Sequence, residues 1–244
     1  MKDLQRYNEE LRSQRRWMPQ EAQPESQRAA IHRLAEAMRE TIEALMDSDA
    51  SAEELNEVAG LVEEVAQRLE SGPRGRALWG FAETSNSGDA AAGFDNSPLV
   101  GPGNPIAPPL YLRVENDRVV GTAFYGRQYE GPPDHVHGGI ISASFDELLG
   151  MVQSLTGSPG MTGRLTVHYR SPTPLHTELC FEGWLEGVSG RKISTRGTLH
   201  AGEVLCAESE GLFISMDVGR FAAMKEERDE RLRVVGESGD GSDR

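Results

Sequence analysis

The sequence is poor in cysteine and has no long apolar run, and both absences limit what the protein can be. Its 2 cysteines, Cys180 and Cys206, lie in apolar, strand-like stretches and lack the CxxC spacing of a redox or metal motif. We expect reduced core thiols, as in a cytoplasmic protein. No apolar stretch approaches the about 20 residues of a membrane span, and Glu9 and Glu10 among the N-terminal arginines are unlike a transit peptide. The sequence therefore predicts a cytoplasmic protein.

The sequence also has few basic residues relative to acidic ones. The 244 residues include 25 basic and 39 acidic side chains, which gives a formal net charge of -14. A strongly acidic protein is poorly suited to bind nucleic acid or an anionic membrane surface, so we expect neither as a partner. An anionic small molecule must instead find a local basic patch.

Apolar spacing near the N-terminus predicts two helices joined by a short polar turn. The apolar positions, which step by three and four residues, are Ile31, Leu34, Met38, Ile42 and Leu45, then Leu55, Val58, Val62, Val65 and Leu69. Ser51 followed by Glu54 is a capping box, which predicts the start of the second helix. We expect a hairpin over about 27–70 that serves packing or oligomerisation, with a partner-binding coiled coil as the alternative.

The rest of the chain divides by composition and by alternation. Residues 1–72 form the helical extension, 73–105 a Gly/Pro-rich linker or covering segment, 106–217 the main domain and 218–244 a charged, partly disordered tail. In the main domain, stretches of alternating apolar and polar residues predict strands over 110–114, 119–125, 161–169, 177–186, 192–200 and 204–216. With one long helix between the second and third stretches, they predict an α+β architecture with an antiparallel sheet.

The connection before that helix carries the candidate chemistry. Residues 131–139 read Gly-Pro-Pro-Asp-His-Val-His-Gly-Gly, a rigid loop that turns through two glycines into the helix. Gly138 and Gly139 place backbone N–H groups at the helix N-terminus, where unpaired donors and partial positive charge favour an oxyanion. Asp146 lies two turns further along, about 10 Å from Gly139 along the axis. One carbonyl carbon cannot meet both groups on one helix, so the sequence predicts a composite site in a symmetric dimer.

The order of these features resembles the hotdog-fold acyl-CoA thioesterases, in the branch that contains the phenylacetate-degradation (PaaI-like) and mammalian thioesterase-superfamily members. The matching motifs are His137-Gly138-Gly139, the later Asp146, Met161-Thr162, Tyr169-Arg170-Ser171-Pro172 and Gly190-Arg191-Lys192. They fall within roughly 106–216, which is under half of the chain. The resemblance implies an antiparallel sheet wrapped around the long central helix, with the helical hairpin as an extension outside the basic fold.

The resemblance also implies a role for each site residue. Asp146 would be the nucleophile or the general base on water, and a backbone N–H of Gly139 or Gly138 would polarise the thioester carbonyl. Thr162 would hold the water or the carboxylate, and its hydroxyl can donate to Asp146. His137 would orient the loop or a substrate group. The implied reaction is hydrolysis of an acyl-CoA to a free acid and coenzyme A, in a homodimer or homotetramer and without a metal or bound cofactor.

Coenzyme A carries several phosphate charges, so an acidic protein needs positive charge where the cofactor docks. Between Met161 and His200, five basic side chains (Lys and Arg) stand against three acidic ones. We expect Arg191 and Lys192, at a hairpin tip, to contact phosphate, and His168 to contact the coenzyme A moiety.

Two alternative functions stay open. A hotdog hydratase needs an Asp and a His together, and Asp134 and His137 are the candidates, although they precede the helix. A non-catalytic acyl-CoA sensor is also compatible with the sequence, because sequence does not show turnover. Asp134, His135 and His137 make a poor metal site, since no further Cys or carboxylate stands at a supporting spacing.

Overall fold

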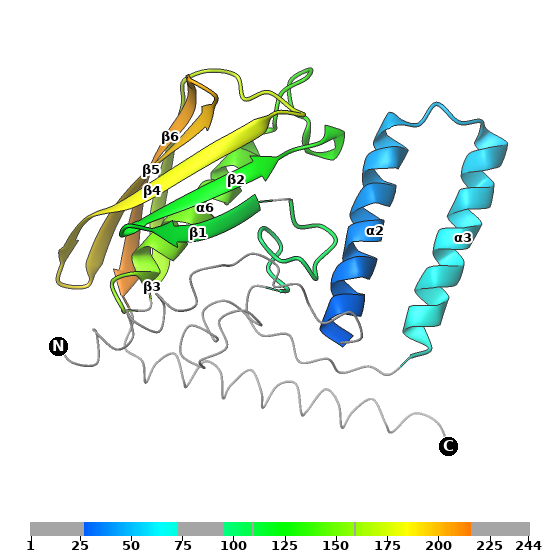
Figure 1. Cartoon of the computed structure of the whole chain (residues 1–244), viewed down its shortest axis with the longest axis horizontal. Coiled ribbons are helices and arrows are strands. Elements are labelled where there is room, and N and C mark those ends of the chain that lie inside the picture. Colours follow the sequence, from blue (N-terminus) through cyan, green and yellow to red (C-terminus); the bar gives the residue numbers. More distant parts are fainter. Residues whose placement is uncertain (1–26, 73–94, 109, 159, 216–244) are drawn as a thin grey trace.

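The computed structural model describes residues 27–72, 95–108, 110–158 and 160–215 (Figure 1). The sequence-based assignments for 1–26, 73–94 and 218–244 lie outside these residues. Within the described ranges the two extension helices, the central helix and the six strands are all present, close to the predicted bounds. A short 3-10 helix, η1 (Arg127–Tyr129), precedes the loop that leads into the central helix.

Six strands form one antiparallel sheet. They are β1 (Leu110–Glu115), β2 (Arg118–Phe124), β3 (Gly160–Tyr169), β4 (Glu178–Ser189), β5 (Lys192–Ala201) and β6 (Val204–Ser215), in the spatial order β1-β2-β4-β5-β6-β3. Asn116 and Asp117 make the β1–β2 turn with φ of 47° and 64°, the left-handed geometry that a two-residue hairpin needs. The order leaves β3 at an edge of the sheet, next to β6.

Helix α6 (Gly138–Ser154) lies across one face of this sheet (Figure 1). Its sheet-facing side chains recur at helical spacing and are at most 2% exposed, namely Ile141, Phe145, Leu148, Leu149 and Val152. Beneath them, Gly183 of β4 is paired with Gly197 of β5. A Cβ atom would lie 2.9 Å from the Val152 side chain at Gly183 and 3.0 Å from the Leu148 side chain at Gly197, so glycine permits the close approach. The sheet wraps around the helix in the hotdog fold, as predicted.

The extension consists of α2 (Gln27–Asp47) and α3 (Ala52–Glu70). The predicted capping box starts α3, because Ser51 Oγ accepts the Glu54 N–H while the Glu54 carboxylate accepts the Ser51 N–H at 2.9 Å. Figure 1 shows α3 beyond α2, on the side away from the sheet. Among the described helices, none is long and apolar enough to span a bilayer.

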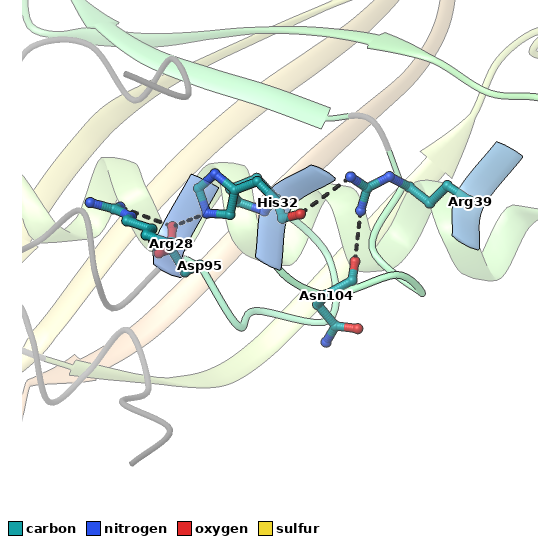
Figure 2. Close-up of polar contacts among 6 residues, drawn as sticks. Arg28, His32, Arg39, Asp95 and Asn104 are labelled. Carbon is teal, nitrogen blue, oxygen red and sulfur yellow. Dashed lines mark hydrogen bonds and ion pairs between the residues drawn. The ribbon is translucent and has the colours of Figure 1, made fainter. Parts of the chain in front are cut away.

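Charged side chains attach α2 to the rest of the protein, beside the buried Ala35 and the contact of Ile31 with Gly103. Arg28 donates to both carboxylate oxygens of Asp95, at 2.6 and 2.9 Å, and His32 Nε2 lies 3.2 Å from the same carboxylate (Figure 2). Arg39 donates to two backbone carbonyl groups of the same segment, one of them that of Asn104 at 2.9 Å. These contacts join the first extension helix to residues 95–108.

Residues 95–108, which we call the cover segment, pack against the main domain. Val100 and Ala107 are each 2% exposed, and Val100 belongs to the hydrophobic core. Ser97 Oγ accepts the N–H groups of Leu99 and Val100, which fixes a tight turn at the start of the segment. These residues therefore contact both α2 and the hotdog domain.

Candidate active site

The start of α6 is held by His137, which is the N-cap residue of the helix. Its Nδ1 atom accepts a hydrogen bond from the Gly139 N–H at 2.9 Å, so the neutral ring carries its proton on Nε2. The preceding loop packs tightly against this histidine, because a Cβ atom on Gly131 would lie 2.7 Å from the His137 Cα atom. His137 therefore orients the loop and the start of the helix.

The two glycines after His137 are not equivalent as donors. The Gly139 N–H is occupied by the histidine ring, and the N–H groups of Ile140 and Ile141 donate to the His137 carbonyl group at 2.9 and 3.3 Å. The Gly138 N–H has no acceptor among the residues that the structure describes. Of the two glycines named from the sequence, Gly138 is therefore the one whose N–H is free to bind a further acceptor, because the cap already uses the donor of Gly139.

Tyr169, at the end of β3, also contacts the start of α6, and sequence reasoning missed this role. Its hydroxyl donates to the Gly138 carbonyl group at 2.7 Å and lies 2.7 Å from Ser142 Oγ. A Cβ atom on Gly138 would lie 3.2 Å from the Tyr169 hydroxyl. In the sequence this tyrosine stood out only as part of the motif Tyr169-Arg170-Ser171-Pro172. Its contact with the start of α6 depends on how β3 is placed against the helix, which the sequence does not show.

Asp146 lies further along α6, on the side that faces β3. Thr162 Oγ1 donates to Asp146 Oδ1 at 2.8 Å, which is the contact that the sequence predicted. The carboxylate is partly buried, and in the described residues no hydrogen bond from a side chain reaches its Oδ2 atom. One oxygen is thus held in place while the other remains able to accept a proton from water.

The two halves of the candidate site lie at opposite ends of the α6–β3 pair. Thr162 near the start of β3 contacts Asp146, and Tyr169 at its end contacts Gly138. The strand therefore runs antiparallel to the helix. With eight residues of helix between Gly138 and Asp146, the two groups are about 12 Å apart along the axis, too far to act on one carbonyl carbon.

The predicted phosphate contacts lie at the Asp146 end of the sheet. Arg191 sits in the turn between β4 and β5, and its Nε donates to the Ser215 carbonyl group at 3.0 Å, which fixes the turn against the end of β6. In the register of the sheet, Lys192 pairs with Ile214, and Ile214 pairs with Met161, the neighbour of Thr162. Arg191 and Lys192 are both exposed.

The wider basic patch is weaker than the sequence count indicated. His168 alternates with Tyr169 along β3, so it points to the face of the sheet opposite α6, where Glu208 is its register partner. Arg170 pairs with Glu208 at 2.7 Å, and Arg196 pairs with two further glutamates at 2.8 and 2.9 Å. These pairs neutralise part of the predicted surplus, and the placement of His168 gives no support to its predicted role.

Asp134 and His135, which precede His137 in the loop, make hydrogen bonds within that loop. The Asp134 N–H donates to Glu130 Oε1 at 2.6 Å, and His135 Nδ1 lies 2.7 Å from the Pro133 carbonyl oxygen. In the described ranges no hydrogen bond joins Asp134 to His137, and no group of three or more His, Cys, Asp or Glu side chains could hold a metal ion. The loop thus positions the start of α6.

Glu147, the residue after Asp146, points to the other side of α6 and was not singled out from the sequence. Ser97 of the cover segment lies 3.3 Å from Glu147 Oε1. Because Ser97 Oγ already accepts two backbone N–H groups, its single proton goes to the carboxylate. Burial, with a smaller effect from the charge of Asp146, raises the pKa of Glu147 to about 7, against a partly compensating hydrogen bond from Ser97.

The raised pKa of Glu147 predicts a stability that falls as pH rises. Between its ordinary pKa of 4.5 and the folded value of about 7, the folded protein binds more protons at Glu147 than the unfolded chain does. Glu147→Gln removes this loss, so the variant should be more stable than the wild type by on the order of 1–3 kcal/mol at pH 8 and about equal to it at pH 4.5. Urea unfolding between pH 4.5 and pH 8 measures the free energy of unfolding of both proteins. Glu53→Gln, on the exposed first turn of α3, is the control. If the free energies of the wild type and of Glu147→Gln depend on pH in the same way, the raised pKa of Glu147 is wrong.

A hotdog sheet around a helix that carries a held carboxylate and, at its start, a free backbone donor is the arrangement of the class of proteins that the sequence resembles. Comparison with known proteins agrees. A family model described as Thioesterase superfamily matches residues 134–207. Acyl-coenzyme A thioesterase THEM4 of Xenopus laevis is 33% identical over 93 residues, which are 37% of this chain and 42% of that protein. THEM4 of Mus musculus is 30% identical over 110 residues, 44% of this chain and 47% of that protein.

The matched part thus spans less than half the length of these relatives. A solved structure gives the broader match. The crystal structure of the thioesterase superfamily protein RHA08564 is 33% identical, with a TM-score of 0.68, and the match covers 76% of this chain and 90% of that one. The chain belongs to the thioesterase superfamily.

Proposed function

We propose that this protein hydrolyses acyl-CoA thioesters to a free carboxylic acid and coenzyme A. The observation that carries the proposal is the 2.8 Å hydrogen bond from Thr162 to Asp146, in the middle of a helix whose N-terminus offers the free Gly138 N–H. A carboxylate base and an oxyanion donor are the two groups that acyl transfer to water needs. Membership of the superfamily and the two relatives, acyl-coenzyme A thioesterases by name, support it.

The proposed active site is shared by two copies of the chain. β3 is an edge strand, and its outer edge has no partner strand among the described residues. Antiparallel pairing of β3 with a second β3 about an axis near Leu165 places Thr162 opposite Tyr169 of the second copy, since the two residues flank that axis at similar separations. Asp146 of one chain then meets Gly138 of the other.

The side of α6 turned away from the sheet favours the same dimer. Gly139, Ala143 and Gly150 lie on that side, roughly opposite the buried stripe, so two helices can approach closely there. The dimer thereby resolves the separation of the two groups on one helix. An even-numbered oligomer is the functional unit that we propose.

In this site Asp146 takes a proton from a water molecule, whose oxygen attacks the thioester carbonyl carbon. The carbonyl oxygen becomes an oxyanion and accepts a hydrogen bond from the Gly138 N–H of the other chain. The carbon–sulfur bond then breaks, and coenzyme A leaves with the proton that Asp146 held. Alternatively the Asp146 carboxylate attacks the carbonyl carbon itself and breaks the carbon–sulfur bond, so that coenzyme A leaves as a thiolate. Water then hydrolyses the resulting anhydride, which returns the Asp146 carboxylate and releases the acid, and a proton from that water neutralises the thiolate. Both routes use the same protein atoms.

The direct test is a panel of acyl-CoA substrates, aliphatic and aromatic, with detection of the released thiol. We expect thiol release from at least one member, with strict dependence on Asp146. A protein that releases no thiol but changes the ultraviolet absorbance of an enoyl-CoA is a hydratase, and one that binds acyl-CoA without either change is a sensor. Either result overturns the proposed hydrolysis.

Replacing both Arg191 and Lys192 with Ala should raise KM for a full acyl-CoA by about tenfold with little change in kcat, because phosphate contacts on exposed groups are partly screened by water. The effect should weaken as salt rises. It should nearly vanish for an acyl-pantetheine thioester, which lacks the nucleotide. Arg113→Ala, at the distant β1 strand, is the control, and an equal loss on both substrates would show that the turn acts only through its shape.

A further inference from the structure

Helix α3 exposes its entire apolar stripe. In the described chain none of its residues is buried, and its large apolar side chains are 39–62% exposed, namely Leu55, Val58, Leu61, Val62, Val65 and Leu69. A helix gains most of its stability in a protein from packing such a stripe. The apolar stripe of α2 adds to this surface, because Leu34, Met38, Ile42 and Leu45 are 37–60% exposed.

The stripe of α3 follows a seven-residue repeat. Leu55, Val62 and Leu69 occupy the first position of the repeat and Val58 and Val65 the fourth, which are the a and d positions of a coiled coil. The e position is alanine each time, at Ala52, Ala59 and Ala66. Apolar residues at three of seven positions are typical of a helix in a bundle, and a small residue at the flank lets a neighbouring helix approach closely.

We propose that α3 packs antiparallel against α3 of a second copy of this chain, across a two-fold axis near Gly60. In the register that pairs a positions with d positions, Leu55 faces Val65 and Val58 faces Val62 of the second copy. On the e side of the seam, Ala59 then meets Ala59 of the second copy, and Ala52 meets Ala66. This register pairs four of the five a and d side chains with each other, and Leu69, at the end of the helix, faces Ser51 of the second copy.

The charged residues of α3 also favour antiparallel pairing with a second copy of the helix. The g positions, which flank the other side of the seam, are Glu54, Leu61 and Arg68, and Arg68 is the only basic residue of α3. In the antiparallel register Glu54 of each copy lies opposite Arg68 of the other, which forms two ion pairs, whereas in a parallel pair the g positions face e positions, which are all alanine, and no ion pair forms. The remaining acidic residues occupy b, c and f positions on the outer side, where water solvates them.

The α3 surface is separate from the proposed active-site interface. Figure 1 shows α3 beyond α2 on the side away from the sheet, whereas β3 and α6 lie on the sheet itself. One chain can therefore use both surfaces at once, each with its own two-fold axis. The α3 seam, widened by the stripe of α2, then joins two active-site dimers into a tetramer.

Cysteine crosslinking tests the register. In a Cys180→Ser background, which removes the exposed native thiol, mild oxidation of Ala59→Cys should join two chains covalently, because Ala59 meets its own copy at the axis. Gly60→Cys is the matched control, since it lies at the same height on the outer face and an added Cβ meets no atom within 4 Å. Crosslinking of both variants to the same extent, or of neither, overturns the proposal.

Mass in solution tests the surface without a cysteine. Val62→Glu should halve the mass measured by sedimentation and leave kcat per chain unchanged, because α3 contributes nothing to the catalytic groups. Arg68→Glu should raise the dissociation constant by about three- to tenfold, and Glu54→Gln, which keeps the capping bond to the Ser51 N–H, should recover part of the loss when combined with Arg68→Glu because it removes the repulsion between the two glutamates. If Val62→Glu leaves the mass unchanged, one of the chain's own ends covers α3 and the pairing is wrong.

Discussion

Asp146→Asn is expected to lower kcat for acyl-CoA hydrolysis by about 100-fold or more, while KM changes little. The amide keeps the shape of the carboxylate and can still accept the hydrogen bond from Thr162 Oγ1, now 2.8 Å from Asp146 Oδ1. It cannot take a proton from water or attack a carbonyl carbon. Steady-state rates of thiol release on the best substrate of the panel measure the loss.

Substitutions at Thr162 separate positioning from chemistry. Thr162→Ala should cost less than Asp146→Asn, because it frees the carboxylate without removing it, and Thr162→Ser should restore most of the rate because the hydroxyl remains. A normal rate for Asp146→Asn together with an inactive His137→Ala would move the base to the loop, and the hydratase would then be the better assignment.

The second large effect is expected at Gly138. Gly138→Pro removes the Gly138 N–H, which has no acceptor among the described residues, and proline is well tolerated at the first position of a helix. The preceding residue is already suitable, since His137 has φ −60° and ψ 131°, the extended geometry that proline imposes on its neighbour. Loss of one oxyanion donor should lower kcat by about 100- to 1000-fold.

Gly138→Ala is the matched control for this substitution. It keeps the N–H but adds a Cβ atom in the same place, 3.2 Å from the Tyr169 hydroxyl, so it reports the steric part of the effect alone. The rate ratio between the alanine and proline variants isolates the donor. If the two variants lose activity equally, Gly138 is required for its contact with Tyr169, and its N–H does not bind the oxyanion.

Mixing the two inactive variants tests whether the site is shared. After subunit exchange, half of the dimers contain one Asp146→Asn chain and one Gly138→Pro chain, and one of their two sites carries both native groups. We therefore expect about a quarter of the wild-type rate to return. No recovery in a mixture that demonstrably exchanges subunits would place both groups within one chain.

The regular elements of this fold were predictable because their periodicity records burial. The stripe that includes Ile141, Phe145 and Val152 marks the side of α6 that faces the sheet, and Asn116-Asp117 marks a turn that only a few residue types adopt. The contact between Thr162 and Asp146 followed from the family motif. In each of these cases a local pattern carried the information.

Contacts between distant segments were not predictable in the same way. The donor of Gly139 is lost to the ring of its neighbour His137, a detail set by one side-chain rotamer. Ser97 and Glu147 are far apart in sequence and meet only because the cover segment folds back over α6. The orientation of His168 depends on the pleat of β3 and on the bulge between Thr162 and Arg164. Sequence spacing does not encode these long-range registers.

The way Arg39 holds the cover segment bears on how this chain can diverge. Its guanidinium donates to the carbonyl oxygens of Pro102 and Asn104, and a carbonyl group is present whatever the side chain is. These two bonds therefore do not depend on the side chains of Pro102 and Asn104, although the Asn104 side chain itself bonds the Asn96 carbonyl group and the Ile106 N–H. Asp95 has no such freedom, because Arg28 binds its carboxylate through two hydrogen bonds. The attachment of this extension thus depends on the two arginines and on one acid, while the buried Val100 and the crowded Gly101 restrict the segment between them.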